Sequence, residues 1–209
     1  MWRTVNLNAW VLALALAGTV AAAPFVAAQD DEGTSNAQAR AAARRLADRD
    51  PLVRQRAAEE LARLAAVDQK KLVEGYRLQE KNDRVKLALD WALYRMGKNS
   101  ALFAIVRALD SSRYNQAYAY LTEIESPEPL YAFLERVNRS TQIRLLEVLA
   151  RIGNDETLGK IKPYMASSDP KVADAARFAA REIQARLAAV PAAAPSRQRQ
   201  VGAAPQASP

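Results

Sequence analysis

The stretch Asp50-Pro-Leu-Val-Arg-Gln-Arg-Ala-Ala-Glu-Glu-Leu-Ala-Arg-Leu64 decides the fold class of this chain. Asp50 can cap a helix whose first position is a proline, the helical position at which proline is best tolerated. Apolar residues then recur every three or four positions, at Val53, Ala57, Leu61 and Leu64. This pattern predicts an amphipathic α-helix that buries one stripe of its surface.

The same pattern returns four times along the chain. Side chains that can cap a helix precede each new apolar period, at Asn82-Asp83, Ser111-Ser112, Arg139-Ser140 and Asp169-Pro170. Aligned on these starts, Val53, Val85, Arg113, Thr141 and Val172 form a column with spacings of 32, 28, 28 and 31 residues. Three further columns are apolar throughout: Ala57, Leu89, Ala117, Leu145 and Ala176; Leu61, Leu93, Leu121, Leu149 and Ala180; and Leu64, Met96, Ile124, Ile152 and Ile183. Each helix is predicted to be the second of a helical hairpin.

The first helices of these hairpins are also predicted from amphipathic periods. They are expected at residues 37–47, 69–79, 100–109, 128–137 and 156–166, and Pro163 is expected to kink or shorten the last. Gly97 and Gly153 lie just beyond two second helices, where a left-handed residue often closes a helix. A single hairpin cannot bury its apolar face alone. The sequence therefore predicts an all-α chain of about five stacked antiparallel hairpins.

The stretch from Asp50 to Leu64 resembles the second helix of a HEAT repeat, and Asp169-Pro-Lys-Val-Ala-Asp-Ala-Ala-Arg-Phe-Ala179 repeats its opening. Full-length HEAT repeats have about 40 to 47 residues. The shorter spacing here is similar to that of the compact HEAT-like repeats of the phycobilisome-lyase type. The resemblance covers about three quarters of the chain. It implies a right-handed α-solenoid but says little about function, because repeat scaffolds host many unrelated binding roles.

The two ends differ from the repeat region, which is expected at residues 36–190. Residues 1–28 have the features of a secretory signal peptide, with an apolar run and small residues before a cleavage point after Ala28. An uncleaved membrane anchor is the alternative, although Pro24 interrupts the apolar stretch. Residues 29–35 are expected to form a polar linker, and the Pro/Ala-rich residues 191–209 a disordered tail. We therefore expect a periplasmic or secreted protein.

Composition narrows the possible chemistry. The chain has no histidine and no cysteine, which excludes Ser-His-Asp and Cys-His catalytic groups and zinc sites built on those ligands. Removal of the leader takes away Arg3 alone, so the mature chain carries 29 basic and 23 acidic residues, a net charge of +6. The charges are spread along the chain. We expect no catalytic residues, no metal and no cofactor.

A partner-binding site is predicted on the second helices, which line the concave face of such a scaffold. Tyr114 and Tyr118 lie four positions apart and are expected to project together, since exposed tyrosines are typical of binding surfaces. The alternative is that these rings cover a thin part of the core. The complete predicted site is Lys86, Asp90, Tyr94, Tyr114, Tyr118, Gln142 and Leu146. For Lys86 and Asp90, an intrahelical ion pair is the alternative, and Trp91 is expected to pack between helices.

Two other functions stay open from the sequence. The resemblance implies a bilin-lyase-like enzyme as one alternative, which co-purified colour would support. A nucleic-acid-binding protein is the other, if the leader is misread. Its basis is the net charge and the arginines between Arg40 and Arg56. No aromatic residue is interleaved with these arginines, so a solvated end face is the preferred interpretation.

Overall fold

The structure, a computed structural model, describes residues 27–189 of the chain, with side chains from Gly33 onward. Within this range every regular element is a helix, which confirms the all-α fold class. No helix of the described residues combines the length and the hydrophobicity that crossing a membrane requires. The predicted tail and nearly all of the predicted signal peptide lie outside the described residues.

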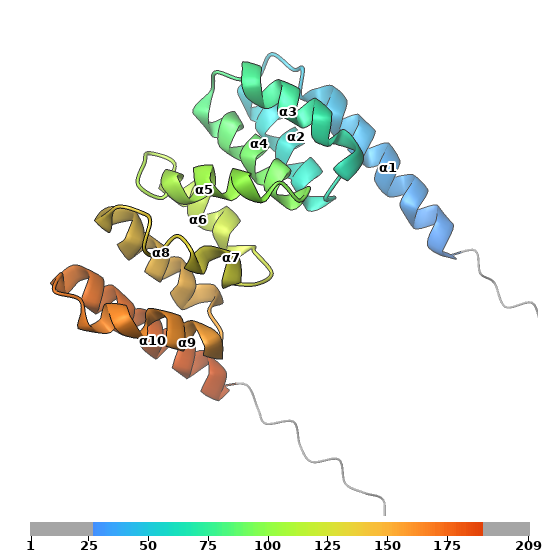
Figure 1. The fold of residues 1–209 in the computed structure, drawn as a ribbon. Coiled ribbons are helices and arrows are strands. Elements are labelled where there is room, and N and C mark those ends of the chain that lie inside the picture. Colours follow the sequence, from blue (N-terminus) through green and yellow to red (C-terminus); the bar gives the residue numbers. More distant parts are fainter. Residues whose placement is uncertain (1–26, 190–209) are drawn as a thin grey trace, which may run out of the picture.

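The helices follow one another in chain order along a curved row, with α1 at one end and α10 at the other (Figure 1). The five predicted second helices are α2 (Pro51–Arg63), α4 (Asp83–Arg95), α6 (Tyr114–Thr122), α8 (Arg139–Ile152) and α10 (Pro170–Ala189). The helices that precede them are α1 (Ala27–Arg45), α3 (Lys70–Gln79), α5 (Leu102–Ala108), α7 (Glu128–Tyr131) and α9 (Asp155–Ile161). Short 3-10 turns form η1 (Val67–Gln69), η2 (Asn99–Ala101) and η3 (Lys162–Ala166).

The second helices begin where the sequence predicts, because their capping side chains are local. Asp50 accepts a hydrogen bond from the Leu52 amide at 2.8 Å, and the Asn82 side chain caps α4 in the same way. In α8 the capping residue is Asn138, one position before the predicted Arg139-Ser140 pair; its side chain accepts from the Thr141 amide at 2.8 Å. The predicted starts are therefore correct to within a few residues.

The first helices differ more from the prediction. The sequence predicts one helix over residues 128–137, but α7 ends at Tyr131. The chain then continues as turns in which an amide donates to the carbonyl three residues earlier, as Phe133 does to Leu130. Pro163 shortens α9 as predicted, because the α-helix ends at Ile161 and a 3-10 turn follows. Helix α1 begins at Ala27, so residues 29–35 are helical rather than the predicted linker.

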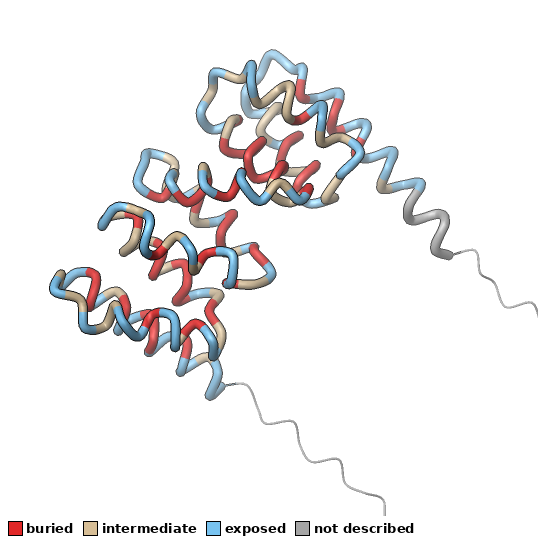
Figure 2. The backbone as a smooth tube through the Cα atoms, viewed as in Figure 1, coloured by how far each residue is buried: buried red, intermediate tan, exposed pale blue. Residues whose placement is uncertain are grey.

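The core runs along the second helices (Figure 2). Every member of the columns that begin with Ala57 and Leu61 is buried, whereas three of the five members are buried in the columns that begin with Val53 and Leu64. The packing is uneven along the row: α2 packs extensively on α4, and α8 on α10, whereas α6 makes smaller contacts with α4 and α8. The middle of the row is thus the part where the second helices are least closely packed.

Candidate functional site: a groove between α2, α4 and α6

The predicted partner-binding site on the second helices is wrong at two of its positions. Leu146 is fully buried, and Asp90 is 7% exposed, so neither side chain is available to a partner. Asp90 accepts from the Arg77 Nε at 2.7 Å, while Lys86 pairs with Asp83 at 3.7 Å. The intrahelical pair between Lys86 and Asp90 is therefore absent. The position four residues after Lys86 points toward the neighbouring helix α3 and not toward solvent.

The two predicted tyrosines lie together but are tied to α8. The rings of Tyr114 and Tyr118 are 5.7 Å apart, and both are half-buried. The Tyr114 hydroxyl donates to Glu147 at 3.1 Å, and the guanidinium of Arg144 lies 4.9 Å from the Tyr114 ring centroid. Burial and the nearby Glu147 carboxylate raise the pKa of Tyr114. These contacts favour the alternative that the rings cover the core between α6 and α8.

The two remaining predicted site residues also make internal contacts. Gln142 donates from its side-chain amide to the Leu134 carbonyl at 2.6 Å. Tyr94 is half-buried against Trp91, with ring centroids 5.7 Å apart, and burial raises its pKa. The structure does not bring the seven predicted residues together into one exposed surface.

A groove of about 580 Å³ lies instead on the other side of Trp91. It is lined by α2, α4 and α6 together with Glu123, which directly follows α6. The lining combines two aromatic rings, two alanines and six charged side chains: Trp91, Tyr120, Ala62, Ala119, Arg56, Glu59, Glu60, Arg63, Arg95 and Glu123. Second helices from three successive hairpins thus contribute to one concave feature.

The floor of the groove is held rigidly. Trp91 and Tyr120 are 3% and 5% exposed, and their rings stack at 5.3 Å with an interplanar angle of 3°. The Tyr120 hydroxyl donates to Glu59 at 2.6 Å and accepts from the Gln116 amide at 2.8 Å. Burial and the hydrogen bond to Glu59 both raise the pKa of Tyr120. The phenol therefore stays protonated at physiological pH and serves as a fixed donor.

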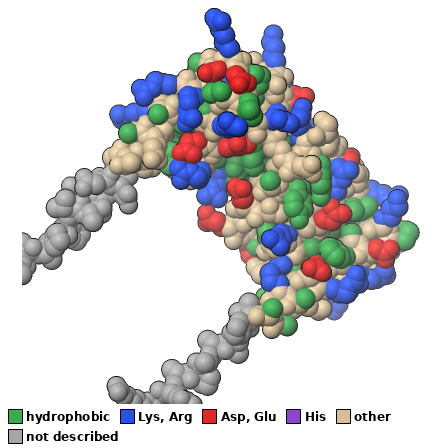
Figure 3. All heavy atoms as spheres, turned by 180° about the vertical axis from the view of Figure 1, so that it is seen from behind, with side chains coloured by type: hydrophobic (Ala, Val, Ile, Leu, Met, Phe, Trp, Pro, Cys, Tyr) green, Lys and Arg blue, Asp and Glu red, His purple; other side chains and the backbone are tan. Residues whose placement is uncertain are grey.

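The rim of the groove carries three basic and three acidic side chains. Arg63 pairs with Glu60 at 2.7 Å, and Arg95 pairs with Glu125 at 3.5 Å while its guanidinium lies 5.7 Å from the Trp91 ring centroid. Arg56 and Glu123 form no ion pair with another described residue, so both are available to an incoming group. From behind, the molecule shows interspersed basic and acidic side chains around hydrophobic patches (Figure 3).

The sequence analysis found only part of this groove. The packing role predicted for Trp91 is confirmed by its two ring contacts. Tyr120 is not among the predicted site residues, because the spacing of Tyr114 and Tyr118 favours the opposite side of the same helix. One signal was available: Tyr120 directly precedes the core position Leu121, so it lies beside the buried stripe of α6.

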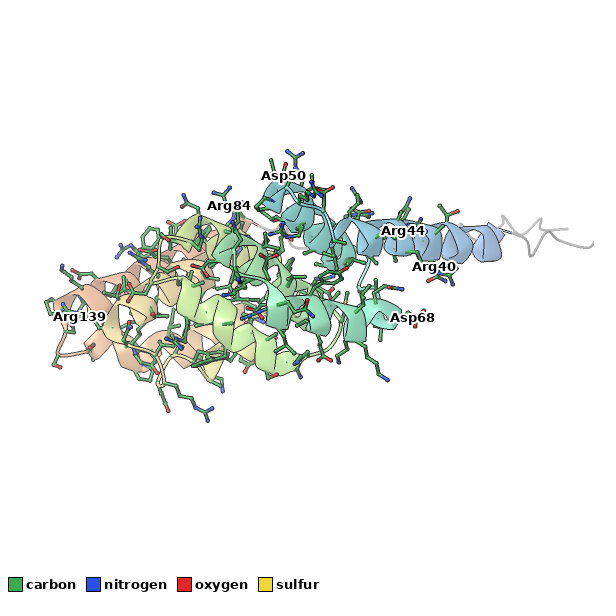
Figure 4. The ribbon with its side chains drawn as sticks, turned by 90° about the horizontal axis from the view of Figure 1, so that it is seen from above. Arg40, Arg44, Asp50, Asp68, Arg84 and Arg139 are labelled. Carbon is green, nitrogen blue, oxygen red and sulfur yellow. The ribbon has the colours of Figure 1, made fainter. Side chains whose placement is uncertain are left out.

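The arginines between Arg40 and Arg56 are not all available to a phosphate. Figure 4 shows Arg40 and Arg44 on α1, and Arg40 borders a hollow beside Asp68. Arg54 is bound to Glu80 and is not free for a phosphate. Among the described residues, no cluster of three or more acidic side chains is arranged to hold a metal ion.

Comparison with known proteins adds little to this geometry. No protein-family model matches the chain, and no curated protein matches it significantly. Among solved structures, the crystal structure of an engineered protein aligns with 78% of this chain and 93% of its own, at 16% sequence identity and a TM-score of 0.34. A likeness of this size carries no argument about fold or function.

Proposed function

We propose that this chain is an exported, non-catalytic scaffold of HEAT-like repeats, a right-handed α-solenoid, that binds a protein partner on the face formed by its second helices. Two features support the solenoid. The buried columns recur at spacings near thirty residues, and each second helix from α2 to α10 carries the same stripe toward the core. Stacking of such units gives one continuous core.

The observation that carries the binding function is the groove between α2, α4 and α6. The stack of Trp91 on Tyr120 and the hydrogen bond to Glu59 already fix its floor in the free protein. Binding of a partner therefore costs little conformational entropy in these side chains. Arg56 and Glu123 supply one free charge of each sign on the rim. A peptide segment that carries both an acidic and a basic residue matches this arrangement.

The absence of histidine and cysteine from the whole chain supports a non-catalytic role. Export rests on the leader, residues 1–28, and places the protein in the periplasm or outside the cell. N-terminal sequencing of the protein from the native cell tests this part separately. We expect a mature protein that begins at Gln29, whereas a chain that retains Met1 would contradict cleavage and release from the membrane.

Charge reversal tests the groove. The double variant Arg56→Glu, Glu123→Arg keeps the net charge, and we expect it to lose the proteins that the parent chain captures from an envelope fraction, measured by quantitative mass spectrometry. The matched control, Glu135→Arg with Arg136→Glu, exchanges two exposed charges outside the groove and is expected to capture the same proteins as the parent. Equal capture by all three proteins would rule out the groove as the binding site.

A further inference from the structure

The end of the row after α10 exposes positions that are covered in the preceding hairpin. Leu146, Leu149 and Ala150 on α8 are at most 4% exposed. In the repeat register, the equivalents of these three residues 31 positions later are Arg177, Ala180 and Arg181 on α10. No described helix packs beyond α10, so Arg177 and Arg181 are exposed, although Ala180 is still buried by its own neighbours.

The helix that covers α8 shows what kind of element suits this face. α10 packs along α8 in the same direction, because Arg139 at the start of α8 pairs with Asp169 just before α10, and Arg186 near the end of α10 donates to the Ala150 carbonyl at 2.8 Å. Ile183 of α10 lies directly beside Gly153. A further helix parallel to α10 would continue the row on the equivalent face of α10, where Gln184 takes the place of Gly153.

A second groove of about 580 Å³ lies on this face, between α9, η3 and α10. Its apolar lining comes from Leu158, Met165 and Ala180. Leu187 is 40% exposed and lies two turns beyond Ala180 along the same stripe of α10. Partly exposed apolar side chains thus lie at the end of the molecule, in the groove at Leu158 and Met165 and beyond it at Leu187.

The charged side chains that line this second groove are all basic. Lys162, Arg177 and Arg181 line it, and no acidic residue does so. Arg177 makes an exposed ion pair with Asp174 at 3.0 Å, which contributes little and leaves the guanidinium accessible. Lys162 and Arg181 have no ion-pair partner among the described residues. An acidic partner is therefore favoured over a neutral or basic one.

We propose that this second groove binds an acidic amphipathic helix of a protein partner, which packs parallel to α10 as α10 packs on α8. Apolar residues three and four positions apart in the partner cover Leu158, Met165 and Leu187. Aspartate or glutamate residues beside that stripe meet Lys162, Arg177 and Arg181. The site is separate from the groove between α2, α4 and α6, and it does not depend on the function proposed for that groove.

Segments of this chain are poor occupants of the second groove. Residues 190–209 contain two arginines and no acidic residue, so they are repelled by its rim. The first turns of α1 are acidic, but alanine is their only apolar side chain, which cannot fill an apolar groove. The charges and the shape together point to a different protein.

The test uses the full chain and two fluorescent helical peptides of about 18 residues, which give five helical turns. Both carry leucines on one stripe; glutamates flank the stripe in one peptide and lysines in the other. We expect the glutamate peptide to bind with an affinity about tenfold or more above that of the lysine peptide, measured by fluorescence anisotropy. The variant Arg177→Glu, Arg181→Glu is expected to reverse this preference, with unchanged helical circular dichroism.

Further measurements distinguish an acidic helix from other occupants of the second groove. Met165→Gln is expected to lower the affinity for the glutamate peptide. Arg56→Glu, in the groove between α2, α4 and α6, is expected to leave that affinity unchanged. Equal binding of both peptides, or no effect of the reversed arginines, overturns the proposal. Binding to phosphatidylglycerol vesicles without binding to the glutamate peptide assigns the groove to a lipid surface and also overturns it. Self-association that the reversed arginines abolish, seen by sedimentation, would assign it to a second copy.

Discussion

Gly97 and Gly153 follow second helices, yet glycine is required at the two positions for different reasons. Gly97 has a φ of 82°, the left-handed conformation that was predicted for both. Gly153 has a φ of −62°, so that prediction is wrong for it. A Cβ atom at Gly153 would lie 2.5 Å from the Leu149 carbonyl oxygen and 2.6 Å from Cδ1 of Ile183. The backbone oxygen of Leu149 and the approach of Ile183 on α10 together explain this glycine, and the sequence could not reveal these contacts.

Alanine substitution distinguishes a steric need for glycine from the general effect of glycine on helix propensity. Gly153→Ala is expected to lower the free energy of unfolding by about 1–3 kcal/mol, because the added methyl overpacks the contact between α8 and α10. Gly75→Ala serves as the control: nothing lies within 4 Å of a Cβ there. This change inside α3 is expected to raise stability by about 0.5–1 kcal/mol. Urea denaturation measures both, and an unchanged midpoint for Gly153→Ala would contradict the close packing of the two helices.

The ion pair of Arg54 and Glu80 connects two elements and strongly shifts the pKa of its carboxylate. Arg54 donates to both oxygens of Glu80, at 2.7 and 2.9 Å, and thereby joins α2 to the end of α3. The carboxylate also accepts from the backbone amides of Lys81 and Asn82. The bond to Arg54, aided by these amides, lowers the pKa of Glu80 from 4.5 to about 2. The ionised carboxylate is therefore more favourable in the folded chain than in the unfolded one.

The stability contributed by this pair is expected to be complete above pH 4.5 and to be lost as the pH falls toward 2, because the unfolded chain binds the proton first. Glu80→Gln is expected to flatten the dependence of the unfolding free energy on pH in that window. Arg54→Ala is expected to cost about 2 kcal/mol at neutral pH, since it leaves a largely buried carboxylate unpaired. Arg63→Ala, which removes an exposed pair with Glu60, is expected to lower the free energy of unfolding much less than Arg54→Ala does. Similar losses for the two arginine variants would refute this ranking.

The elements also show how far the sequence could be interpreted. Caps and apolar stripes are local, so the starts of α2 and α4 and the burial of Leu61 and Leu93 followed directly from the residues. The site did not. Whether Asp90 faces solvent depends on where Arg77 of the neighbouring helix lies, and the groove exists only because α6 approaches α2. Distances between helices cannot be obtained from a single periodic pattern.

On the scale of the whole molecule, Tyr120 joins the first three hairpins. Its hydroxyl reaches Glu59 on α2, and its ring stacks on Trp91 of α4, while the direct contacts between α4 and α6 are small. The closely packed pairs at the two ends of the row are thus connected through a sparsely packed centre. Tyr120 is thus one of the contacts that bridge the centre, together with α5, which packs on α4, α6 and α8.

Two substitutions at Tyr120 distinguish the hydrogen bond from the ring. Tyr120→Phe keeps the stack and is expected to lower the unfolding free energy by about 1–2 kcal/mol, because Glu59 loses a donor. Tyr120→Ala removes the stack as well and is expected to cost about 3–5 kcal/mol. Small-angle X-ray scattering is expected to show a changed radius of gyration for the alanine variant and not for the phenylalanine variant. Identical scattering from both would show that the centre is held by other contacts.

The contact between Glu59 and Tyr120 spans 61 residues, and this separation has a consequence for the newly made chain. A polypeptide that emerges with its N-terminus first presents α2 and α4 before α6 has left the ribosome. Until α6 arrives, the indole ring of Trp91 lacks the partner that covers it, and the first two hairpins expose an apolar surface that attracts other chains. Slow synthesis would therefore be most harmful just before α6 emerges, and a chaperone that shields this surface would have its largest effect at that moment.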